Sequence, residues 1–138
     1  MASRLPLFAA ALWWGSLTAV GFMVVPMLFA HLPTPAMAGR MAARLFSAQT
    51  WVSVACGAAL LLVLKQNVAE AGVDTERKAI IIVVAGLLLA LLVEFAVAPR
   101  IVARQDLRLW HGVGTVLYAL QWLCAAALLW RLGGGKRG

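Results

Sequence analysis

Four long apolar runs dominate the chain, at residues 5–32, 45–64, 79–99 and 109–130. Each is long enough to cross the hydrocarbon core as an α-helix, which takes about 20 residues. The runs are continuous rather than alternating. Because backbone amides inside lipid must be paired within their own segment or a closed barrel, continuous runs favour helices. We therefore predict an all-α fold: one four-helix transmembrane bundle with up-down-up-down topology over residues 1–138.

Composition supports a membrane protein and argues against a soluble one. Hydrophobic residues make up 64% of the chain and charged residues 12%, against roughly one half and one quarter in soluble domains. The net charge is +7, but the basic residues flank the apolar runs instead of gathering on one face. We therefore expect a lipid bilayer and no nucleic acid as the partner. The first run is too long for a signal peptide and lacks its cleavage site, and residues 131–138 read as a flexible basic tail.

The distribution of basic residues predicts an orientation. Four spans place both termini and the 65–78 connector on one side, with seven basic residues, and leave five on the other. The positive-inside rule then favours both termini in the cytoplasm. Pro26 and Pro99, each followed by an arginine-bearing connector, form a faint repeat.

The five arginines on the side opposite the termini are predicted to contact an anion or lipid headgroups, or to be merely solvated. They are Arg40, Arg44, Arg100, Arg104 and Arg108.

Polar positions inside the spans indicate a pocket near the arginine-rich end. Glu94 is the main candidate, because an intramembrane carboxylate is costly and usually faces the bundle interior. At 100° per residue, polar stripes on the other spans reach a similar depth. The alternative is that each group only bonds a neighbouring helix, with Glu94 paired to a basic residue. The predicted ligand pocket comprises Gln49, Ser53, Glu94, His111, Thr115 and Tyr118.

Soft donors suggest two kinds of cofactor. Met23, Met27 and His31 recur every four residues, and with His111 they form a donor set suited to copper as Cu(I). The alternative is that the methionines fill gaps between helices. His31 and His111 could instead bind haem b axially, without covalent attachment because no C-x-x-C-H motif is present. No nucleophile or phosphate-binding motif occurs, which disfavours an enzyme.

Several short strings resemble a bacterial membrane family grouped with the eukaryotic transmembrane protein 205. The strings are Trp14-Gly15-Ser16, Gly21-Phe22, Leu32-Pro33, Ala38-Gly39, Leu45-Phe46 and His111-Gly112. The resemblance implies a four-helix protein of the bacterial inner membrane, and the eukaryotic relative's link to platinum resistance implies metal handling or membrane traffic. The layout is also distantly similar to the CopD copper-resistance domain and to the membrane protoporphyrinogen oxidase HemJ.

Three functions therefore stay open at the level of sequence. The first is a small non-enzymatic membrane protein that binds or moves a small ligand, such as a soft metal ion, through the predicted pocket. The second is an accessory structural subunit of a larger membrane complex, or a homo-oligomer. The third is a haem- or quinone-linked redox protein.

Overall fold

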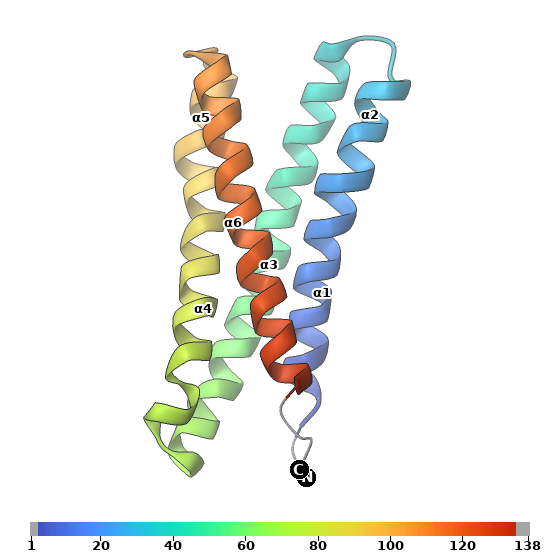
Figure 1. Ribbon diagram of the computed structural model, residues 1–138. Helices are drawn as coiled ribbons and strands as arrows, with labels where there is room; N and C mark the ends of the chain where they lie inside the picture. Colours follow the sequence, from blue (N-terminus) through green and yellow to red (C-terminus); the bar gives the residue numbers. More distant parts are fainter. Residues whose placement is uncertain (1–2, 135–138) are drawn as a thin grey trace.

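A computed structural model describes residues 3–134, which form helices and no strand. Four continuous helical spans are long and apolar enough to cross a membrane, which confirms the all-α transmembrane prediction. The first span is α1, η1 and α2, the second is α3, the third is α4, η2 and α5, and the fourth is α6 (Figure 1). Their bounds are α1 Leu5–Ala19, η1 Val20–Val24, α2 Val25–His31, α3 Pro35–Ala71, α4 Val73–Leu92, η2 Val93–Val97, α5 Ala98–Val102 and α6 Leu107–Gly134.

The second span is much longer than its apolar run. It begins at Pro35, where the Thr34 hydroxyl accepts a hydrogen bond from the Met37 N–H at 3.2 Å. It continues to Ala71, and Gly72 alone joins it to α4. The polar stretch at 65–78 is therefore mostly helix and not the expected loop, since its Lys, Gln, Glu and Ala residues are good helix formers.

The fourth span also exceeds its predicted end. The helix α6 continues through Arg131 to Gly134, so residues 131–134 do not belong to a flexible tail. The remaining tail positions, 135–138, lie outside the described residues.

The bundle is packed most tightly at the end that holds the termini. Trp13 and Leu17 of α1 are fully buried there against Leu60, Val83 and Leu128. Toward the opposite end the helices separate into two pairs, α2 with α3 and α5 with α6 (Figure 1). The arginine-bearing connectors lie at this more open end, so groups between the pairs are held by fewer neighbours than the core.

One π-helical turn interrupts the first span and another interrupts the third. They are η1 and η2, and a proline is the second residue after each, Pro26 and Pro99. A proline removes a backbone N–H donor and disturbs the preceding turn. Single π-helical turns inside α-helices are frequent at functional sites, and the second of these turns contains Glu94.

Candidate functional site

A layer of buried polar side chains lies between the apolar core and the more open end of the bundle. Gln49 and Ser53 on α3 are 4% and 0% exposed, and Thr50 on α3 and Gln121 on α6 are equally buried. The Gln49 Nε2 donates to Ser16 Oγ at 2.9 Å and to Ser53 Oγ at 3.5 Å. The Ser16 hydroxyl in turn donates to the Trp13 carbonyl at 3.0 Å. This chain of bonds ties α3 to α1, as the packing alternative for these residues expects.

Two aromatic side chains tie α6 to the first span in the same layer. The Tyr118 hydroxyl donates to the Leu17 carbonyl at 2.6 Å, and the Trp122 Nε1 donates to Thr18 Oγ1 at 2.8 Å. Tyr118 lies against Gly21, where a Cβ would be only 2.5 Å from its ring. The tyrosine is therefore wedged into the first π-helical turn.

The cavity enclosed by this layer is small. Its volume is about 10 Å³, close to the minimum that holds one water molecule. It is lined by Phe46, Gln49, Thr50, Ala90, Val93, Tyr118 and Gln121. The buried polar layer is thus a packed, hydrogen-bonded region and offers no room for a larger ligand.

The Glu94 side chain does not line this cavity, although its neighbour Val93 does. Glu94 is half-buried in η2. Its Oε1 accepts a hydrogen bond of 2.7 Å from the Ser47 hydroxyl of α3. The partner that the structure gives the carboxylate, within residues 3–134, is therefore a neutral hydroxyl on a neighbouring helix and not a basic side chain. The alternative of a paired Glu94 therefore finds no support, and Ser47 is a partner that the sequence did not reveal.

His111 and Thr115 do not join the polar layer. Both are exposed on α6, and the Thr115 hydroxyl donates to the His111 carbonyl within the same helix at 2.8 Å. The structure brings together Gln49 and Ser53, places Tyr118 beside them, and leaves these two residues outside. Helical periodicity predicts which face of α6 carries them. That face is exposed here because the two helix pairs separate at this end.

The predicted metal ligands are exposed as well. Met23 and Met27 are 56% and 54% exposed, and His31 and His111 are exposed at the same end. The His31 Nδ1 lies 3.0 Å from the Met27 carbonyl. Within the described part of the chain, no three His, Cys, Asp or Glu side chains are placed to hold one metal ion. These residues thus provide no enclosed donor set for copper or for haem b.

The five predicted anion-binding arginines are all exposed. The Arg100 guanidinium stacks 4.7 Å from the centroid of the Trp110 ring and donates to the Ala96 carbonyl at 2.6 Å. The remaining four are Arg40, Arg44, Arg104 and Arg108. Arg40 and Arg44 lie in α3 and Arg108 in α6, whereas Arg104 lies between α5 and α6. Their exposure fits contact with headgroups or solvent, and the anion prediction stays a prediction.

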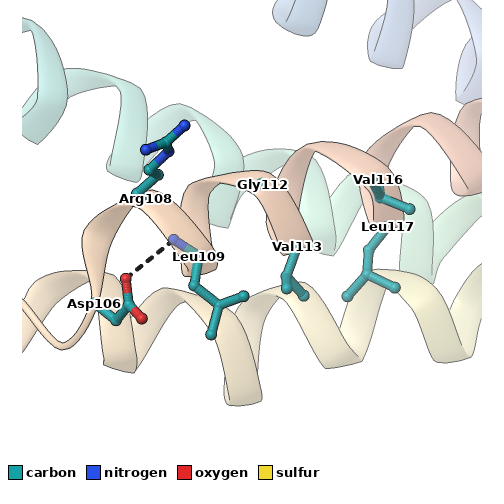
Figure 2. Close-up of a pocket in the computed structure, with 7 residues that line it drawn as sticks. All are labelled: Asp106, Arg108, Leu109, Gly112, Val113, Val116 and Leu117. Atoms are coloured by element: carbon teal, nitrogen blue, oxygen red, sulfur yellow. Dashed lines mark hydrogen bonds between the residues drawn. The ribbon is translucent and has the colours of Figure 1, made fainter.

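A shallow groove of about 690 Å³ follows the first turns of α6 (Figure 2). The Asp106 carboxylate accepts a hydrogen bond from the Leu109 N–H at 3.3 Å and so caps the helix. Beside it are the charged Arg108 and an apolar strip that includes Gly112 and Val116.

A domain of unknown function, DUF4149, matches residues 8–109. The chain belongs to the DUF4149 family. No curated protein and no solved structure matches it. Because the DUF4149 family has no assigned activity, membership alone does not identify a ligand.

The DUF4149 match covers only part of the site. It includes Glu94 and Ser47, and also Ser16 and Gln49 of the buried layer. It ends at residue 109, so Tyr118 and Gln121 lie outside the matched region. The carboxylate–hydroxyl pair therefore belongs entirely to the part of this protein that shows its DUF4149 membership.

Proposed function

We propose that this protein binds a small positively charged ligand at Glu94 and Ser47, and that this binding serves to hold or move the ligand across the membrane. One observation supports the proposal: Glu94 is an intramembrane carboxylate that, among the residues the structure describes, accepts a hydrogen bond from a neutral hydroxyl. A carboxylate has about four acceptor positions, so most of its capacity is available to a ligand. Charged groups at membrane depth are rare and usually functional.

The position of Glu94 also favours ligand access. It lies in η2, on the part of the third span where the two helix pairs separate (Figure 1). Ser47 belongs to α3, in the other pair. The bond between them therefore joins the two pairs, and a cation that competes for the carboxylate would loosen that connection.

A soft metal ion is the narrowest version of this proposal. It rests on the expected link to the transmembrane protein 205 group. The donors first expected, Met23, Met27 and His31, are exposed and do not enclose a site. Because Cu(I) prefers sulfur and imidazole to carboxylate oxygen, in this version the Glu94 carboxylate attracts the ion and a methionine or histidine side chain completes its coordination. We further propose a bacterial inner membrane location, which the resemblance to a bacterial membrane family implies, with cytoplasmic termini, which the basic-residue distribution favours.

The test compares Glu94→Gln with the wild-type protein purified in detergent. Cu(I) and tetramethylammonium serve as probe cations, and binding is read as a rise in unfolding temperature during titration. A hydrogen bond or ion pair to a charged group contributes about 1.5–3 kcal/mol, so losing the charge is expected to weaken binding by about tenfold or more.

The matched control is Glu70→Gln, which makes the same change at an exposed position near the end of α3. It is expected to leave the titration unchanged. If neither probe stabilises the wild-type protein, or if both variants respond like the wild type, the proposal is wrong.

A further inference from the structure

The two halves of the chain repeat one sequence pattern and one backbone arrangement at their π-helical turns. Adding 73 to each residue number of η1 gives η2, and both read Val-x-Phe-x-Val. The backbone bonds that begin the two turns also correspond. The Val20 N–H reaches the carbonyls of Leu17 and Ser16, and the Val93 N–H reaches those of Ala90 and Leu89.

The helices α3 and α6 correspond in the same way, with an offset of 72. Gln49 matches Gln121, and both are 4% exposed. Phe46 matches Tyr118, and the two rings meet edge to face with their centroids 5.4 Å apart. The two halves therefore place equivalent residues around one point in the middle of the bundle.

In the first half, a tyrosine hydroxyl occupies the opened turn. Tyr118 donates to the Leu17 carbonyl at 2.6 Å, and its hydroxyl oxygen would lie 2.9 Å from a Cβ added at Gly21. Leu17 and Gly21 are four residues apart, so an uninterrupted α-helix would join the Gly21 N–H directly to the Leu17 carbonyl. A side chain inserted into that ladder is a known cause of a helix interruption.

In the second half the equivalent turn meets a different side chain. The counterparts of Leu17 and Gly21 are Ala90 and Glu94, and the counterpart of Tyr118 is Phe46, which has no hydroxyl. The water-sized cavity lies at this place, because Phe46, Ala90 and Val93 all line it. Three buried polar side chains complete its lining, Gln49, Thr50 and Gln121.

We propose that this cavity binds one water molecule, which takes the role of the Tyr118 hydroxyl in the second half. The water donates to the Ala90 carbonyl and accepts from the Glu94 N–H, with the glutamine amides as further partners. A buried water typically makes about three hydrogen bonds. The turn that carries Glu94 is then closed by an exchangeable molecule, whereas η1 is closed by an attached side chain. This site does not depend on a ligand at the Glu94 carboxylate.

The test is to supply the hydroxyl with Phe46→Tyr in the full-length protein. A structure of the wild-type protein at a resolution that shows ordered water is expected to show one water within hydrogen-bonding distance of the Ala90 carbonyl. In Phe46→Tyr the new hydroxyl is expected at that position, with the water gone. Replacing an ordered water by a group that reproduces its bonds loses little, so the unfolding temperature is expected to stay level or rise.

Two further variants serve as controls. Tyr118→Phe removes the hydroxyl from the first half and is expected to lower the unfolding temperature. Phe95→Tyr adds a hydroxyl to η2 at a ring that is 64% exposed and should not remove the water. A dry cavity in the wild-type structure overturns the proposal whether or not Phe46→Tyr folds. So does a water that persists in Phe46→Tyr.

Discussion

Single glycines decide how closely the helices of this bundle approach. At Gly21 a Cβ would lie 2.5 Å from the Tyr118 ring, and at Gly86 it would lie 2.7 Å from the Trp13 ring. Neither ring can move aside easily, because Tyr118 is held by its bond to Leu17 and Trp13 is fully buried. At Gly57 the contact is with the flexible end of Leu87, so that position is more tolerant.

Gly21→Ala is therefore expected to destabilise the protein. Overpacking a well-packed interior costs about 1–3 kcal/mol, and here it would also displace the Tyr118 hydroxyl. Gly15→Ala is the matched control on the same span, since its Cβ would meet no atom within 4 Å. Thermal unfolding in detergent should show a lower midpoint for Gly21→Ala only, and equal midpoints would contradict the close contact.

At this scale the sequence revealed some functional candidates and missed others. Glu94 was found because a carboxylate within an apolar run is conspicuous. Ser47 was missed because a helical serine commonly bonds its own backbone, and its partner is 47 positions away. Periodicity alone predicts that His111 and Thr115 face the interior of the bundle. It gives the face of one helix on which they lie, but not whether a neighbouring helix covers that face.

Among the elements, α3 and α4 are joined more tightly than the sequence predicts. Gly72 is their whole connector and has a φ of +90°. L-residues with a side chain rarely adopt this conformation. The number and order of the spans followed from hydrophobicity, but helix ends depend on the propensity of polar residues and on this turn. The sequence indicates the π-helical turns only indirectly, through Pro26 and Pro99.

Gly72→Ala is expected to strain this turn. Forcing a non-glycine residue into such a conformation costs about 1–3 kcal/mol, and the effect should be local to the ends of α3 and α4. Hydrogen exchange measured on peptides from residues 65–80 should become faster. Gly133→Ala, near the end of α6 and in open space, is the comparison variant. Unchanged exchange in both would show that the turn relaxes without cost.

For the whole molecule, four spans fix the relation between the connectors. The α3–α4 turn at Gly72 and the loop before α6 at Gln105 lie at opposite ends of the bundle (Figure 1). The number of spans alone requires these two sites to be on opposite sides of the membrane, whichever side faces the cytoplasm. The sequence alone predicts that these two connectors lie on opposite sides. It does not predict that the helices separate into two pairs, because that depends on how all four spans pack together.

Single cysteines at positions 72 and 105 test this arrangement. In a background with Cys56→Ala and Cys124→Ala, a membrane-impermeant maleimide applied to intact cells should label one position, and permeabilisation should add the other. The positive-inside rule favours labelling of position 105 first. Labelling of both positions in intact cells would contradict a four-span fold.

The length of α3 has a practical consequence. Its 37 residues extend about 55 Å at 1.5 Å per residue, well beyond the roughly 30 Å of hydrocarbon. The α3–α4 hairpin therefore carries rigid helix outside the bilayer and turns there within one residue. A helical marker protein spliced in at Gly72 would continue both helices without a flexible linker. It would give this 14.7 kDa molecule an asymmetric feature by which electron-microscope images could be aligned.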